Sequence, residues 1–346
     1  MKVCVIGAFG FDTMPTGGQP VKTRNLFWLL SKYYGTDEVS YVETYGWKKH
    51  PFKIMKDIRC AVKQSENVIM LPAHNGVKVF APLLCKYAKG TSVKLFYDVI
   101  GGWLPQKTER NKKLAAVLRR FNGIWVETSS MKNTLERQGF SNVLVIPNFK
   151  FITPLTPEEL PPVEKPYRLC TFSRVMKEKG IEDAIDAVIW VNHYSGNIVY
   201  TLDIYGPVDE KQIEWFDRLK KNFPKYIRYQ GCVDSDKSVE VLKNYFALLF
   251  PTHFYTEGVP GTIIDAYAAG IPVISTKWEN FEDVVENEKT GIGYEFEHEE
   301  QLREILLHVV KHSNIIMDMK KCCLNKMIEY APERIIQIII EKLALS

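Results

Sequence analysis

The chain has 346 residues, of which 46% are apolar, 12% aromatic and 25% charged. This length exceeds one ordinary hydrophobic core and favours two domains of a globular protein. No apolar run reaches the roughly 20 residues that a membrane span needs, and Met1 and Lys2 lead directly into a strand-like segment where a signal peptide would stand. The seven cysteines lack paired spacing, so we expect them to be reduced in a cytosolic protein.

The net charge of +4 hides an uneven distribution. Residues 1–150 hold 23 basic and 10 acidic side chains, whereas residues 151–346 hold 22 and 31. A basic first half indicates an anionic partner. Residues 47–63 concentrate this charge at helical spacing, which fits either a solvated helix face or a peripheral contact with anionic lipid headgroups. No nucleic-acid-binding motif accompanies the charge, so we expect no nucleic-acid partner. The basic residues of this segment are Lys48, Lys49, Lys53, Lys56, Arg59 and Lys63.

Short apolar segments alternate with helical patterns along residues 1–150. Helices of this length between strands indicate βαβ units and a parallel sheet. The expected strands are residues 2–9, 39–45, 67–74, 93–100, 123–128 and 142–148. The expected helices are residues 21–34, 77–89, 107–121 and 129–138.

A proline-rich segment separates this half from a second one of the same design. Residues 151–166 contain five prolines and little periodicity, which is typical of a linker. The sequence therefore predicts two doubly wound α/β domains, residues 1–150 and 167–346, with a cleft between them and a last helix that could pack back on the first domain. The expected strands of the second half are 167–173, 199–206, 227–231, 247–251 and 272–276, and the expected helices are 180–194, 209–222, 236–245, 262–269 and a terminal helical region.

The stretch TEGVPGTIIDAYAAG, residues 256–270, follows a predicted strand and opens a predicted helix. Ligands of open α/β sheets bind at the carboxyl ends of strands. Gly258 and Gly261 let the backbone approach a ligand, and Pro260 stiffens the turn. Thr262 can begin the helix, whose free N–H groups and dipole suit a phosphate.

Two carboxylates flank this helix start. Glu257 stays in the loop, near whatever the phosphate carries, and Asp265 lies about one turn into the helix, within reach of ribose hydroxyls. This pattern fits a sugar–diphosphate–nucleoside. Taken singly, Asp265 could merely suit the helix dipole and Glu257 could be a solvated loop acid.

The same residues resemble the E-x7-E motif of retaining family-4 glycosyltransferases, which have the GT-B fold. The resemblance extends over nearly the whole chain, through residues 15–26, 142–148, 171–187, 202–210, 227–233, 269–276 and 290–296. It implies that Arg174, Lys179 and Glu257 form the catalytic set, with Arg174 and Lys179 on the donor's diphosphate. It further implies donor contacts from Gly17, Gly18, Gly206, Val233, Gly258, Val259, Pro260, Gly261, Thr262 and Asp265.

The chain departs from the family pattern in two places. The second acid is Asp265 and not Glu, which resembles a subset of polysaccharide-building members. Many relatives carry a His near the donor sugar, where residues 95–103 offer Tyr97 and Asp98 instead. The identity of the donor sugar therefore stays open.

The chemistry that the resemblance implies depends on charge. Breaking the anomeric C–O bond leaves negative charge on a nucleoside diphosphate, which Arg174 and Lys179 can stabilise. We therefore expect no obligatory metal and no other cofactor. Asp234 and Asp236 form a DxD pattern, but they precede a predicted helix, and Asp234, Ser235 or Asp236 is expected to be its N-cap.

Candidates for the acceptor or sugar side are His74 and Asp98, each at the end of a predicted strand, although each could equally be structural. His253 precedes the acid loop and either positions it or packs. The remaining histidines form no cluster with ligand spacing.

The expected function is transfer of a sugar from a nucleotide-sugar donor to a saccharide hydroxyl, with retained configuration and without a metal. The resemblance and the basic first half favour a lipid-linked acceptor, surface polysaccharide synthesis and a cytoplasmic protein that could contact the inner face of the membrane. A nucleotide-sugar epimerase of the GT-B fold and a non-catalytic nucleotide-sugar-binding protein remain alternatives. The glycines of residues 7–18 have the wrong spacing for a nicotinamide dehydrogenase.

Overall fold

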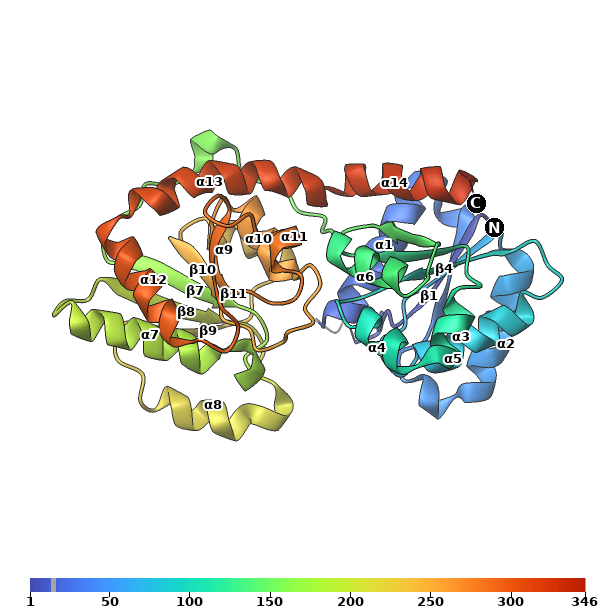
Figure 1. The fold of residues 1–346 in the computed structure, drawn as a ribbon, viewed down its shortest axis with the longest axis horizontal. Coiled ribbons are helices and arrows are strands. Elements are labelled where there is room, and N and C mark those ends of the chain that lie inside the picture. Colours follow the sequence, from blue (N-terminus) through green and yellow to red (C-terminus); the bar gives the residue numbers. More distant parts are fainter. Residues whose placement is uncertain (14–16, 346) are drawn as a thin grey trace. The chain divides into compact units, whose positions relative to one another are not determined.

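The computed structural model describes residues 1–13 and 17–345. The chain divides into two units: Met1–Phe151 together with the chain from Tyr330 onward, and Ile152–Glu329. Each unit is built around a parallel six-stranded sheet flanked by helices, as Figure 1 shows. Among the described residues, no helix is both long enough and apolar enough to cross a membrane.

The sheet of the first unit has the strand order β2-β1-β3-β4-β5-β6. Its strand order reverses between β1 and β3, which both pair in parallel with their neighbours. Its strands are β1 Val3–Gly7, β2 Val39–Glu43, β3 Asn67–Met70, β4 Lys94–Asp98, β5 Gly123–Val126 and β6 Val143–Val145. Its helices are α1 Gly18–Tyr34, α2 Pro51–Gln64, α3 Val77–Tyr87, α4 Leu104–Arg110, α5 Lys112–Leu118, α6 Ser129–Arg137 and α14 Pro332–Leu345.

Strand β1 shows why both faces of this sheet are apolar. Successive side chains of a strand point to opposite faces. Val3 and Val5 pack in one core with α1 and α14, whereas Cys4 and Ile6 pack in another with α2 and α3. All five residues of β1 are buried, as expected for a parallel strand covered on both sides.

The sheet of the second unit has the order β12-β11-β10-β7-β8-β9, which is the doubly wound Rossmann order. Its strand order reverses between β7 and β10, which pair directly. Its strands are β7 Tyr167–Phe172, β8 Tyr200–Tyr205, β9 Ile227–Gly231, β10 Ala247–Phe250, β11 Val273–Thr276 and β12 Gly291–Tyr294. Its helices are α7 Ile181–Tyr194, α8 Ile213–Lys220, α9 Ser238–Leu242, α10 Gly261–Ala268, α11 Phe281–Val284, α12 Glu300–Lys311 and α13 Asn314–Met327.

The predicted fold class, two doubly wound α/β domains, is confirmed, and the differences are local. The helix expected at 107–121 is two helices, because the side chain of Asn111 accepts a hydrogen bond from the Leu114 N–H at 3.0 Å and starts α5 anew. Residues 290–296 are not among the expected strands. They contain β12, which extends the sheet beside β11.

Candidate active site

The three residues of the predicted catalytic set lie where the strand order of the second sheet reverses. Arg174 is the second residue after the end of β7, and Lys179 ends the 3-10 turn η4 (Lys177–Lys179) in the same connection. Glu257 lies in the connection between β10 and α10. Because β7 and β10 are parallel neighbours, their carboxyl ends meet at one edge, which is the binding edge of this architecture.

Two glycines allow the connections at this edge to approach closely. Gly180 has φ +67, and a Cβ there would lie 1.8 Å from the carbonyl oxygen of Pro251, after β10. Gly206 has φ +127, and a Cβ there would lie 1.9 Å from the carbonyl oxygen of Ser173, after β7. Any larger residue would push the connections apart. Gly206 therefore allows the connection after β8 to lie against the residues that follow β7.

Lys179 and Glu257 form an ion pair. Their side chains are 16% and 18% exposed, so the pair is shielded from solvent but still open to a ligand. The ammonium lies 5.1 Å from the ring centre of Phe250 and 5.0 Å from that of Phe254. Aromatic faces attract a cation and lower the local dielectric, which strengthens its field.

The loop that carries Glu257 is fixed by several hydrogen bonds. Asn280 donates to the Glu257 carbonyl at 2.7 Å. The His253 N–H donates to the Glu178 carbonyl at 2.9 Å, and its Nε2 lies 2.6 Å from Asp183 Oδ2. Burial raises the pKa of Asp183, while the hydrogen bond from His253 opposes that shift. These contacts tie the acid loop to the start of α7.

Arg174 is the more open cation of the set. Its side chain is 49% exposed, and Nη1 lies 3.6 Å from Asp209 Oδ2. A half-exposed guanidinium with one distant carboxylate keeps its planar donors available for an anion. Arg174 and Lys179 therefore offer different cations, one free to move and one held in place.

The start of α10 has the geometry that the glycine-rich stretch predicts. Pro260 is the N-cap residue and Gly261 begins the helix, while Gly258 and Val259 are buried beneath the turn. Thr262 Oγ1 is buried and has no hydrogen-bond partner among the residues described. A helix start with open N–H groups suits a negatively charged group. Val233 is half-buried just after β9, along the same edge of the sheet.

Asp265 lies deeper than an open ribose-binding residue would. Its side chain is 2% exposed, and Oδ1 accepts a hydrogen bond from Ser238 Oγ at 3.0 Å. Ser238 begins α9, so this bond joins α9 to α10 within the second unit. The predicted contact with ribose stays a prediction, and it requires this bond to open or to be shared.

The DxD residues meet the capping expectation only in part. Asp234 is the N-cap residue of a 3-10 turn, but its carboxylate lies 3.7 Å from Lys237 Nζ instead of bonding to the turn's N–H groups.

Asp183, His253 and Glu299 bring potential ligand atoms within 4.8 Å of one another among the described residues. Sequence spacing gave no sign of this cluster, because its members lie on three separate segments.

In the first unit, a charged cluster lies at the carboxyl ends of β4 and β5. Lys22 Nζ lies 2.9 Å from Asp98 Oδ1 and 2.8 Å from Glu127 Oε1, and it donates to the Val99 carbonyl at 2.7 Å. The three side chains are at most 3% exposed. Burial raises the pKa of Asp98 to about 6, against the pull of Lys22. Asp98 is thus an inward-facing partner of Lys22.

The other predicted residues of this unit are more open. The ring of His74 packs against Trp103, with ring centres 4.1 Å apart and the ring planes tilted by 32°. Partial burial and the nearby Lys107 lower the pKa of His74, so the imidazole favours its neutral form. Gly17 and Gly18 cap and begin α1 after β1. Pro15 and Thr16 of the predicted glycine loop lie outside the described residues.

Sequence reasoning missed Lys22, Glu127, Asp183, Asn280 and Ser238. Each is a common residue type whose importance comes from a partner distant in the chain. The one available signal was a polar residue within an apolar pattern, as for Lys22 in helix α1.

Comparison with known protein families gives one match. Residues 166–312 match the family model described as glycosyl transferases group 1. No curated protein matches the chain by sequence.

Solved structures share the fold over most or all of the chain. HepE of Anabaena in complex with UDP and glucose has a TM-score of 0.76 at 13% identity, with 100% of both chains covered. Sucrose-phosphate synthase of Thermosynechococcus elongatus has a TM-score of 0.75 at 14% identity, also with 100% of both chains covered. The pneumococcal O-GlcNAc transferase GtfA in complex with UDP and GlcNAc has a TM-score of 0.63 at 16% identity, with 84% of this chain and 59% of that chain covered. These solved structures show that the chain has the two-domain GT-B fold, within which residues 166–312 match the glycosyl transferases group 1 model.

Proposed function

We propose that this protein transfers a sugar from a nucleotide-sugar donor to a hydroxyl of a saccharide acceptor, with retained anomeric configuration. The observation that carries the proposal is the Lys179–Glu257 pair at the carboxyl ends of β7 and β10, with Arg174 beside it in the chain. These are two cations and a carboxylate at the ligand-binding edge of a Rossmann sheet.

In the proposed reaction, the donor's diphosphate accepts hydrogen bonds from Arg174 and Lys179. As the anomeric C–O bond breaks, negative charge grows on the phosphate oxygen, and both cations stabilise it. The start of α10 adds oriented N–H groups. Glu257 holds Lys179 in place before the donor binds and contacts the sugar afterwards. Because two side-chain cations stabilise the leaving group, the proposed reaction needs no divalent metal.

UDP-sugars are the first donors to test, because HepE and GtfA are solved with UDP. A thermal-shift screen of UDP-, GDP-, ADP- and TDP-glucose should identify the base, since a ligand that binds the folded state raises the melting temperature. Transfer is then measured with a saccharide acceptor, with and without EDTA. Lys179→Ala should reduce turnover about 10²- to 10³-fold.

The matched control is Lys177→Ala, an exposed lysine of the same turn η4, which should leave turnover unchanged. Equal turnover of both variants would overturn the assignment of Lys179. Consumption of the nucleotide sugar without any acceptor would favour an epimerase, and thermal stabilisation without turnover would favour a binding protein. NMR of the product's anomeric proton reports whether configuration is retained.

We further propose that the acceptor is lipid-linked, as in surface polysaccharide synthesis, and that α2 meets anionic lipid. Helix α2 buries Ile54 and Ile58 and turns its lysines outward. Phe52 is 84% exposed beside them, which suits insertion among headgroups. Binding to vesicles of phosphatidylglycerol and phosphatidylcholine should fall with salt and with Phe52→Ser. Vesicle binding that changes neither with salt nor with Phe52→Ser would contradict this part of the proposal.

A further inference from the structure

A cavity of about 470 Å³ opens at the amino ends of strands in the second sheet, whereas the proposed donor site lies at the carboxyl ends. Its lining includes Arg168, Thr201 and Arg228, each the second residue of its strand, β7, β8 and β9. Strands of a parallel sheet begin at one edge and end at the other. The cavity is therefore separate from the residues that follow these strands, and it lies wholly within one unit.

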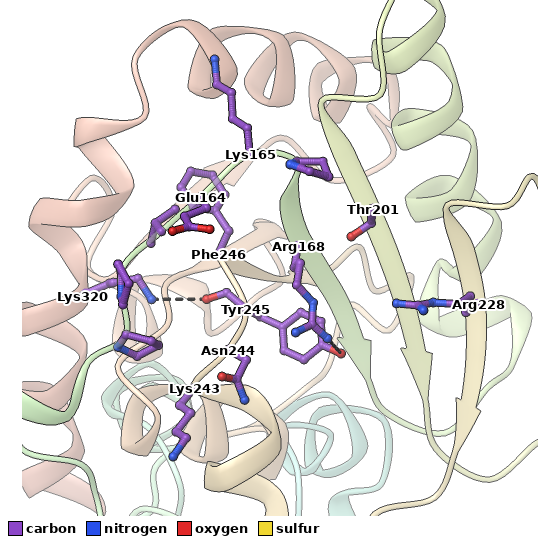
Figure 2. Close-up of a pocket in the computed structure, with 14 residues that line it drawn as sticks. Glu164, Lys165, Arg168, Thr201, Arg228, Lys243, Asn244, Tyr245, Phe246 and Lys320 are labelled. Carbon is purple, nitrogen blue, oxygen red and sulfur yellow. Dashed lines mark hydrogen bonds between the residues drawn. The ribbon is translucent and has the colours of Figure 1, made fainter.

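The cavity is basic. Its lining includes the cations Lys165, Arg168, Arg228, Lys243 and Lys320, and one acid, Glu164. Figure 2 shows Lys165 and Lys243 extending away from the centre in different directions, whereas Lys320 reaches inward toward Tyr245. The basic rim and the inward lysine create a positive potential that attracts anions.

Part of this charge is already balanced. Asp203 lies 3.2 Å from Arg168 and 3.1 Å from Arg228. Although burial opposes its ionisation, hydrogen bonds from Gln230, Tyr245 and Arg168 hold the pKa of Asp203 below its usual value. One carboxylate thus orients two guanidinium groups, and each keeps further N–H donors for a ligand.

Lys320 is the unusual member of the set. It comes from α13, its side chain is 2% exposed, and its ammonium donates to the Tyr245 carbonyl at 3.3 Å. Within the described part of the chain, the ion pairs do not include Lys320. Buried lysines are rare unless they are paired. Burial lowers its pKa to about 8, so at neutral pH it carries a charge that a bound anion would balance.

The remaining walls suit a small organic molecule. Pro161, Pro162 and Phe246 form an apolar side, and Thr201 and Asn244 offer neutral hydrogen-bonding groups. Figure 2 shows Thr201, Asn244 and Phe246 among the residues that line the cavity. The volume is in the range of ligand pockets. We propose that this cavity binds a small organic phosphate of about the size of a sugar phosphate, with Lys320, Arg168 and Arg228 on the phosphate.

The test is calorimetric titration with glucose 1-phosphate, with glucose as the neutral control. All proteins carry Lys179→Ala, which removes a cation of the proposed donor site. Binding at the cavity is then measured independently of transfer, so failure of the proposed function leaves this result interpretable. The expected result is binding of one equivalent of glucose 1-phosphate and none of glucose.

Lys320→Met should weaken this binding at least 10-fold, and Arg228→Gln several-fold. Lys237→Gln, an exposed lysine outside the cavity, should leave it unchanged. Should Lys320→Met fail to fold, as judged by circular dichroism, Arg228→Gln and Lys243→Gln carry the test. The proposal is overturned by the absence of binding, by equal binding of all variants, or by equal binding of glucose.

Discussion

The two units each hold a lysine–carboxylate cluster at the carboxyl edge of a parallel sheet, but the clusters differ in burial and in charge balance. In the first unit, Lys22 serves two carboxylates and the cluster is at most 3% exposed. In the second, Lys179 serves one carboxylate, and the pair is 16% and 18% exposed. Similar chemistry at similar places in the fold therefore differs in its access to solvent. The closed cluster joins buried elements of the first unit, whereas the open pair is the one that we propose to meet the donor's diphosphate.

The largest effect should come from removing the cation of the closed cluster. Lys22→Met leaves Asp98 and Glu127 buried without their counterion, so we expect a loss of about 3–5 kcal/mol in the free energy of unfolding. Denaturant unfolding measures it. The matched control is Lys132→Met, whose pair with Glu136 is exposed and should change stability by about 0–1 kcal/mol. Similar losses for both variants would remove the distinction between closed and open pairs.

The corresponding change in the open pair should alter activity more than stability. Glu257→Gln keeps the side chain's shape but removes the charge that holds Lys179, so we expect turnover to fall about 10- to 10³-fold. The melting temperature should stay close to that of the wild type because the pair is partly open. Steady-state kinetics and a thermal melt measure the two effects. A large loss of stability with normal turnover of the folded fraction would assign the pair a structural role.

The closed cluster holds two carboxylates and one lysine. This excess of acid predicts that the free energy of unfolding depends on pH, with an effect of intermediate size. Asp98 has a pKa of about 6 in the folded protein, above the ordinary 3.8, so the folded state keeps its proton where the unfolded chain has lost it. The stability that this proton contributes is therefore fully present below the pKa of the unfolded chain and is lost as pH rises through about 6. We expect the loss in the free energy of unfolding to be on the order of 1–3 kcal/mol. Asp98→Asn lacks this titration, so its stability relative to the wild type should rise between pH 4 and pH 7.

The measurement is the free energy of unfolding of both proteins across that range. Asp37→Asn is the control, because Asp37 is exposed. A difference between Asp98→Asn and the wild type that stays constant with pH would show that Asp98 titrates normally.

The smallest effect should come from the loop that supports the open pair. His253→Ala removes the contact with Asp183 and loosens the segment before Glu257, so we expect turnover to fall by less than about 10-fold, since one hydrogen bond is worth about 1 kcal/mol. His253→Asn should restore part of it. The control is His298→Ala, an exposed histidine paired with Glu300. Equal effects of His253→Ala and His298→Ala would exclude a positioning role.

The sequence by itself determined the two α/β domains, because alternating apolar strands and helices leave few ways to bury both faces of a sheet. It also placed Arg174, Lys179 and Glu257 after strands, where parallel sheets bind ligands. Only the tertiary structure decided which carboxylates are open to solvent. Asp265 is bonded to Ser238, which lies 27 residues away in the sequence, and Asp98 is paired with Lys22. In both pairs the two residues lie on different elements. The basic cavity around Lys320 likewise required the fold, because it gathers residues from the starts of separate strands. Periodicity is a local property and survives in a sequence, whereas burial and pairing depend on contacts between distant segments.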